Sequence, residues 1–370
     1  MSRRALLDDE LTGSTALIWG GASGVQCVVS IFRSLACVIA VICSCSAEDR
    51  VTLIPEGAVD PVVLIGSVED FTGEELVIRR NGVASADRFS ASTIQSVQTW
   101  KSAVYEQGVA ELQAAETPAA EQSLLKALRE EPRDWVKREI LSMLVRCAIR
   151  QGDWGTAGTR FLQITNQDPK SPHWNIAPIL WAPQPLGDHQ KTLARAWINE
   201  PNSPTRLLAA SWLLQDPVYG EAAEKKLDDL ARDANGIVAS LARSQLWRMR
   251  LGLELSELEI HKWQHEVRRM PRELRAGPQY LVGRGFLQRS EPGAGAAELL
   301  WLSMVYVDNE DLSARALVDA AGALEKTGQS QAAISLYSRI IERFAWSPWA
   351  NEARNARSVL SSPEIGRAHV

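Results

Sequence analysis

The segment at residues 312–360 constrains the fold of this chain more than any other stretch. Leu317, Ala320 and Leu324 recur at helical spacing, so they lie on one face of a predicted helix. Gly328 then predicts the turn that ends this helix, because glycine adopts a left-handed backbone conformation at little cost. A second apolar stripe follows the turn and consists of Ala333, Tyr337, Ile340 and Ile341. Two such helices form a hairpin that cannot bury its own apolar face, so we expect further hairpins to stack against it.

Measured from the turn glycine, the small, aromatic and apolar positions of this hairpin resemble the second helix of a tetratricopeptide repeat (TPR). The residues that carry this resemblance are Gly328, Ala333, Tyr337 and Ile340. The same register fits an earlier stretch with Gly152, Ala157, Phe161, Ile164 and Pro169. A weaker copy contains Ala297, Trp301 and Met304. The resemblance implies an α-solenoid whose concave face binds a protein or an extended peptide, and it does not identify that partner.

The remaining helical sequence, residues 101–363, predicts a mixed solenoid. Residues 204–251 predict short helical pairs that resemble HEAT repeats, because Ala and Leu dominate there without the aromatic positions. Residues 168–187 contain five prolines and predict a long irregular connection between helices. The expected fold class is therefore mainly α, with TPR-like helical hairpins.

Residues 48–100 differ in character from the helical part. Short β-branched runs alternate with turns, and Asn81-Gly82 is a strong hairpin signal. The order of these runs resembles small SH3-like or Sm-like barrels, some of which bind RNA. Here no lysine precedes Lys101, and acidic residues outnumber basic ones. We therefore expect a small β-barrel-like module that serves structure or protein contact, and no nucleic-acid partner.

Residues 1–47 predict a leader. Arg33 precedes an apolar run at residues 35–43, and small residues follow up to Ala47, which is the pattern of a signal peptide. This leader predicts export to the periplasm or cell envelope. Lipidation at Cys45 and retention as a membrane anchor remain alternatives, and the leader is the expected contact with a membrane. The true start codon also stays open.

At the other end, residues 364–370 resemble the conceptual translation of a sequencing adapter. On this hypothesis the tail is an artefact and the natural chain continues beyond about Pro363. The natural C-terminus is then missing from the sequence, and the oligomeric state stays open.

Catalytic and metal-binding patterns are weak throughout. His261 and His265 lie one helical turn apart, but no glutamate follows His261 and no third ligand is evident. Cys147 is expected to be a small buried apolar residue. No nucleophile motif and no acidic metal cluster occurs in the sequence. We therefore expect a protein that is not an enzyme and has neither cofactor nor metal.

Tryptophan and arginine provide the candidate partner contacts. The chain has 13 tryptophans, most of which are expected in the core. Trp346 and Trp349 flank Pro348 and are the two that we expect to contact a partner. Arg268 and Arg272 suggest a patch for an acidic partner. The main hypothesis is a scaffold for protein–protein interaction; the alternatives are a carbohydrate- or peptidoglycan-binding envelope protein that uses exposed tryptophans, and an accessory part of a truncated larger enzyme.

Overall fold

The computed structural model describes residues 48–361, which belong to one compact unit. The predicted signal peptide with Cys45, and the predicted adapter tail at residues 364–370, lie outside the described residues. Within the described range, no helix has both the length and the apolar character needed to cross a bilayer.

The first part of this unit is a five-stranded antiparallel sheet. Its strands are β1 (Asp49–Leu53), β2 (Val62–Phe71), β3 (Glu75–Arg80), β4 (Asp87–Ser90) and β5 (Ile94–Gln98), in the order β4-β3-β2-β1-β5. A short 3₁₀ helix, η1 (Ala91–Thr93), lets β5 return to the free edge of β1. The small all-β module predicted from the sequence is thereby confirmed. β4 and β5 are the two edge strands of this sheet.

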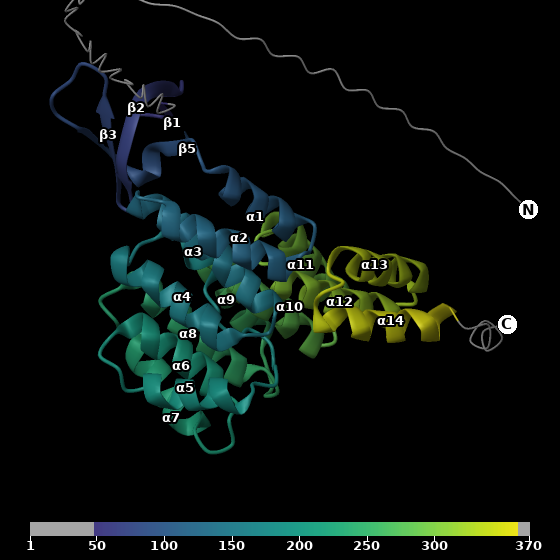
Figure 1. Ribbon diagram of the computed structural model, residues 1–370. Coiled ribbons are helices and arrows are strands. Elements are labelled where there is room, and N and C mark those ends of the chain that lie inside the picture. Colours follow the sequence, from purple (N-terminus) through teal and green to yellow (C-terminus); the bar gives the residue numbers. More distant parts are fainter. Residues whose placement is uncertain (1–47, 362–370) are drawn as a thin grey trace, which may run out of the picture. The chain divides into compact units, whose positions relative to one another are not determined.

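The rest of the unit is helical, and each helix packs chiefly against its neighbours in the sequence (Figure 1). The helices are α1 (Ala103–Gln113), α2 (Thr117–Glu130), α3 (Asp134–Arg150), α4 (Trp154–Gln167), η2 (Pro172–Ile176), α5 (Asp188–Trp197), α6 (Ser203–Leu213), α7 (Gly220–Leu230), α8 (Gly236–Arg250), α9 (Glu257–Arg269), η3 (Arg272–Leu274), α10 (Ala276–Gln288), α11 (Pro292–Val305), α12 (Glu310–Lys326), α13 (Ser330–Arg343) and α14 (Pro348–Ser361). Alternate helices also touch, in the row α6, α8, α10, α12 and α14. This arrangement confirms the predicted stack of hairpins.

Four helix–helix turns share one geometry. Each contains one residue with positive φ, and the N–H of the next residue donates to the carbonyl five positions earlier, as in a Schellman motif. The donor–acceptor pairs are Glu116–Glu111 (2.9 Å), Asp153–Ala148 (2.9 Å), Glu291–Phe286 (3.0 Å) and Gln329–Leu324 (2.9 Å). The turn residues are Ala115, Gly152, Ser290 and Gly328. In all four cases a helix of 14 residues begins two positions after the turn residue.

The same register decides which side chains are buried in these four helices. Five positions after the turn residue the side chain is small, and nine and twelve positions after it an apolar side chain is buried. These buried residues are Ala120, Leu124 and Ala127; Ala157, Phe161 and Ile164; Gly295, Leu299 and Leu302; and Ala333, Tyr337 and Ile340. The small side chain allows close approach of the paired helices, because a Cβ at Gly295 would overlap the Leu287 side chain.

This register corrects the weak repeat expected from the sequence. Ala297, Trp301 and Met304 are exposed on α11 rather than packed against α10. The packing positions lie two residues earlier, beginning at Gly295. The reason is the turn, where Ser290 takes the left-handed conformation (φ 61°) that a glycine adopts in the two clearer copies.

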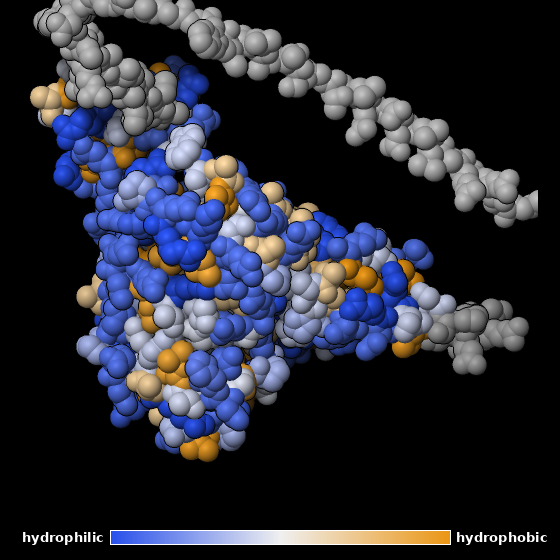
Figure 2. Space-filling model, viewed as in Figure 1, coloured by the Kyte–Doolittle hydropathy of each residue, from blue (hydrophilic) through white to orange (hydrophobic). Residues whose placement is uncertain are grey.

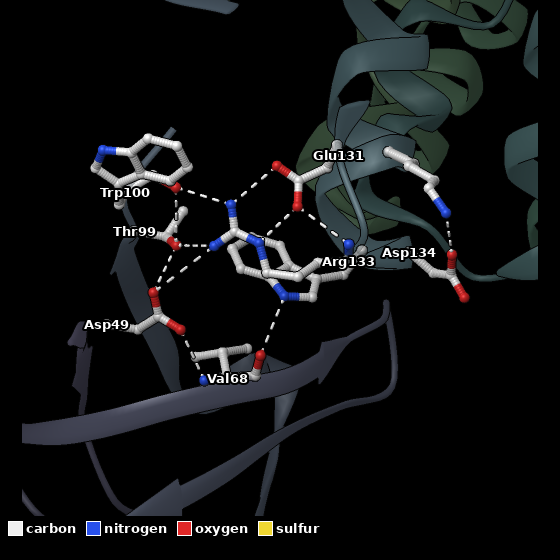
Figure 3. Close-up of polar contacts among 9 residues, drawn as sticks. Asp49, Val68, Thr99, Trp100, Glu131, Arg133 and Asp134 are labelled. Carbon is white, nitrogen blue, oxygen red and sulfur yellow. Dashed lines mark hydrogen bonds and ion pairs between the residues drawn. The ribbon is translucent and has the colours of Figure 1, made fainter. Parts of the chain in front are cut away.

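The sheet and the first hairpins share a hydrophobic core and a polar junction (Figure 3). Arg133, just before α3, donates to the Glu131 carboxylate (Nε–Oε1 2.7 Å), the Thr99 hydroxyl (2.6 Å) and the carbonyl of Trp100 (2.8 Å). The Trp135 indole of α3 donates to the Val68 carbonyl of β2 at 3.3 Å. The sheet is therefore fixed to the start of α3 by directed hydrogen bonds as well as by apolar contact.

The middle of the irregular connection, residues 174–182, is largely buried, whereas residues 183–187 are exposed or half-buried. The Trp174 ring meets Phe161 of α4 edge-on, with centroids 5.1 Å apart. The Trp212 indole of α6 donates to the Pro178 carbonyl at 2.8 Å. Farther along, Trp181 packs on Gly277 of α10, where a Cβ would overlap the indole ring. The connection thus joins the first hairpins to the middle of the stack, with some of its backbone groups paired to side chains as burial requires.

Candidate binding groove and inner cavity

A groove of about 780 Å³ runs along the row of alternate helices. Its lining comes from α8, α10, α12 and α14, with Trp181 and Pro183 of the irregular connection at one side. Apolar side chains such as Leu287 and Val318 alternate with polar ones along it. A surface formed by one helix from each successive hairpin is the kind of groove that a stacked helical array presents to a partner.

One carboxylate that lines the groove, Asp319, is bound by three side chains of this chain. Asp319 of α12 binds Arg284 (3.1 Å) and Arg315 (2.7 Å), and it accepts from the Tyr280 hydroxyl at 2.8 Å. Burial, reinforced by the charge of Asp319, raises the pKa of Tyr280 to about 12, so this hydroxyl remains a donor at neutral pH. The cluster orders α10 against α12, and Asp319 has little capacity left for a ligand.

Arg248 of α8 also lines this groove and is only 4% exposed. Its Nη1 donates to the Ser211 carbonyl (3.0 Å) and to Gln245 Oε1 (2.7 Å), and its Nη2 to Gln215 Oε1 (3.4 Å). Burial lowers the pKa of Arg248 to about 10. Its Nε and the Nε2 of Gln245 have no acceptor among the described residues. Sequence analysis missed Arg248; the available signal was a run of polar residues at buried helical positions, Ser244, Gln245 and Arg248.

A second, smaller cavity of about 70 Å³ lies between α3, the irregular connection and the start of α12. The tryptophans that line it are Trp154, Trp181, Trp346 and Trp349. Arg146 and Arg150 of α3 both bind Glu310 of α12 at 2.7 Å. Although burial opposes it, the bonds from these arginines hold the pKa of Glu310 below its usual range. Ion pairs between distant helices thus border this cavity.

Trp346 and Trp349, the tryptophans expected to contact a partner, are half-buried at this cavity. The Arg150 guanidinium lies 5.3 Å from the Trp346 ring centroid, and that of Arg315 lies 4.5 Å from Trp349. The Trp349 indole donates to Asp311 at 3.2 Å. Both rings therefore already bind groups of this chain, as cation–π and hydrogen-bond partners.

The other candidate residues lie apart from both sites. Arg268 on α9 and Arg272 in η3 are exposed, make no ion pair within residues 48–361, and line neither the groove nor the inner cavity. His261 and His265 are exposed on α9. The described part of the chain contains no group of three His, Cys, Asp or Glu residues placed to hold a metal. Burial raises the pKa of the Cys147 thiol to about 11, which keeps this thiol protonated at neutral pH.

Most of the described tryptophans are at least partly buried, and two are exposed: Trp100 (60%) and Trp301 (54%). The ring pairs join packed side chains, as in Trp247–Trp263 with centroids 5.0 Å apart. The face drawn in Figure 2 is mainly hydrophilic, with apolar residues in small separate groups. Within the described range, neither Trp100 nor Trp301 forms a ring pair with another aromatic side chain.

Comparison with known proteins identifies no family. No family model matches the chain, and no curated protein matches it. Among solved structures, a thermophilic TPR protein of Thermus thermophilus is similar at 14% identity and a TM-score of 0.32, over 70% of this chain and 96% of that one. A TPR protein of Parabacteroides merdae is similar at 12% identity and a TM-score of 0.30, over 70% of this chain and 98% of that one.

Likeness at these scores carries no argument about activity or partners. The shared turn geometry and the repeated burial register stand independently of it. On those grounds the helical part of this chain is a TPR-like α-solenoid preceded by a small antiparallel sheet.

Proposed function

We propose that this protein is a non-enzymatic scaffold that binds an extended segment of another protein in the groove along α8, α10, α12 and α14. The observation that carries the proposal is the groove itself, which is open, about 780 Å³ in volume and built from successive hairpins. Its mixture of apolar side chains and hydrogen-bond donors suits a peptide, because a peptide offers both side chains and backbone carbonyls.

We further propose that the scaffold is exported to the periplasm or cell envelope. The support for this is the sequence of residues 1–47, with Arg33, an apolar run and small residues before the described part begins. A fusion of residues 1–47 to a reporter that is active only outside the cytoplasm should show activity. An inactive but stable fusion would contradict export.

Two helical glycines provide a matched test of groove binding. Gly322 of α12 lines the groove and Gly236, at the start of α8, does not, and a Cβ added at either would meet no atom within 4 Å. The Cβ of a photo-crosslinking amino acid is therefore accommodated at either position. After irradiation in envelope extract, we expect the variant at 322 to capture a discrete protein and the variant at 236 not to do so.

Equal capture by both variants would show non-specific contact and contradict the groove. Capture at neither position, with both variants folded by circular dichroism, would also count against it. Purification of the two variants with added peptidoglycan provides the parallel test for a carbohydrate ligand.

A further inference from the structure

The face of α11 that is turned away from the core, its outer face, is exposed and uncharged. The exposed residues that recur on it at helical spacing are Ala294, Ala297, Trp301 and Met304. Trp301 is 54% exposed and Met304 is 58% exposed. The only charged residue of the helix, Glu298, lies at the side and accepts from Gln264 of α9. Because Leu299 and its neighbours bury the inner face, α11 is apolar on both faces, as is typical of a helix that is covered on both.

Large and small side chains divide this outer face into two halves. Its N-terminal half presents Ala294 and Ala297, and its C-terminal half presents Trp301 and Met304. Consider two copies of the helix packed antiparallel about a twofold axis at the level of residue 299. Position 297 of one copy then opposes position 301 of the other, and position 294 opposes position 304. Each large side chain meets a small one, so the outer face is complementary to itself, as a twofold interface requires.

The neighbouring helix α9 carries charges that suit the same arrangement. Exposed Glu257 lies in its first turn, and exposed Arg268 and Arg269 lie in its last turn. Neither arginine makes an ion pair within the part of the chain that the structure describes. Both α9 and α11 run opposite to α10, since Arg289 after α10 donates to the Leu255 carbonyl before α9 at 2.9 Å. An axis that reverses α11 also reverses α9, so the arginine end of one copy is turned toward the glutamate end of the other.

We propose that this protein forms a twofold-symmetric dimer in which the outer faces of two α11 helices pack antiparallel. Tryptophan and methionine at the centre, with arginine nearby, are the residue types enriched in protein interfaces. One pair of helices with its flanks lies at the small end of specific interfaces, so we expect a weak dimer that dissociates on dilution. The residues of the outer face do not line the groove, so this inference stands apart from the proposed function.

Self-association of the full chain is measured by sedimentation velocity over about 1–500 µM, a range that suits a small interface. We expect the wild type to shift from monomer to dimer within this range. Met304→Lys should weaken the dimer about tenfold or more, because it places a charge at the apolar centre of the interface. Val359→Lys on α14 is the matched control, since Val359 is also a helical residue that is 58% exposed. It should leave the dimer unchanged.

An exchange of the large and small residues tests the register. Ala297→Trp places tryptophan against tryptophan, and Trp301→Ala leaves alanine against alanine, so each should weaken the dimer about tenfold or more. The double variant restores a large residue against a small one in the reverse order. It should recover the affinity to within about threefold of the wild type, because the two changes are directly coupled across the interface. Both positions are exposed in the single chain, so its folding does not depend on them.

Three outcomes would overturn the inference. A dimer that Met304→Lys leaves intact would use another surface. A double variant that associates no better than the two single variants would show that the helices are not paired in this register. A wild type that is monomeric at every concentration would exclude a second copy as the occupant of the outer face. In that case, cosedimentation with vesicles of phosphatidylcholine and phosphatidylglycerol, lost in Met304→Lys, would assign the face to a bilayer instead.

Discussion

At the scale of single residues, the turn positions show how strongly the backbone selects for glycine. Gly152 (φ 73°) and Gly328 (φ 75°) occupy the left-handed region without strain, whereas Ala115 (φ 63°) and Ser290 (φ 61°) occupy it with a Cβ. A side chain in this conformation costs roughly 1–2 kcal/mol, and part of this cost is regained because glycine has the more flexible unfolded state.

We therefore expect Ser290→Gly to raise the free energy of unfolding by up to about 1 kcal/mol, because it relieves this strain at a small cost in unfolded-state entropy. Gly152→Ala should lower it by about 1 kcal/mol through the opposite change. Urea unfolding at fixed pH measures both effects. A loss of stability in Ser290→Gly would show that the serine side chain contributes more than its backbone strain costs.

The same residues explain what sequence analysis could recognise. Two hairpins with a turn glycine could be placed correctly, because glycine marks the left-handed position in the sequence. The hairpin at Ser290 was displaced by two residues and that at Ala115 was not recognised as a repeat, because nothing in these side chains marks the conformation. Arg248 escaped notice for a similar reason: an arginine on a helix is normally solvated, and only packing shows that this one is buried.

At the scale of elements, the irregular connection is the least repeat-like part of the helical region, yet its middle, residues 174–182, is largely buried. Its five prolines predict an irregular segment, in which the structure has the short 3₁₀ helix η2, and they do not predict the burial of its middle. Its burial depends on tertiary contacts with α4 and α6, on either side of it in the sequence, and with the distant α10. Such contacts leave only a weak local signal.

We expect Gly277→Ala to lower the free energy of unfolding by roughly 1–3 kcal/mol, because the new methyl group would displace the rigid Trp181 ring in a packed site. Gly322→Ala on α12 is the control, since its added Cβ meets no atom within 4 Å. That variant should be neutral or more stable by up to about 1 kcal/mol. Equal losses in thermal and urea unfolding of the two variants would show that helix geometry, and not Trp181, sets the cost.

At the scale of the whole unit, the ion pairs from α3 to α12 join residues 160 and 164 positions apart. Glu310 has a pKa below its ordinary value of 4.5 in the folded state. Its contribution to stability is therefore present above about pH 4.5 and is lost as the pH falls through the folded pKa.

We expect Glu310→Gln to lower the free energy of unfolding at pH 7 by roughly 3 kcal/mol, because it leaves Arg150 without its carboxylate and Arg146 with Asp308 alone, at 3.8 Å. The difference from wild type should shrink as the pH is lowered below 4.5. Urea unfolding from pH 7 to pH 3 measures this. A difference independent of pH would mean that shape, and not charge, accounts for the loss.

These ion pairs also affect how the array comes apart. In a linear stack of hairpins each unit touches only the next, so the ends can fray while the middle stays folded. Here α3, a helix of the second hairpin, is joined directly to the start of α12, and the irregular connection joins α4 to α6. Separation of α12 from α3 must break these ion pairs as well as the contacts between adjacent helices. The stack should therefore unfold more cooperatively than contacts between adjacent helices alone would allow.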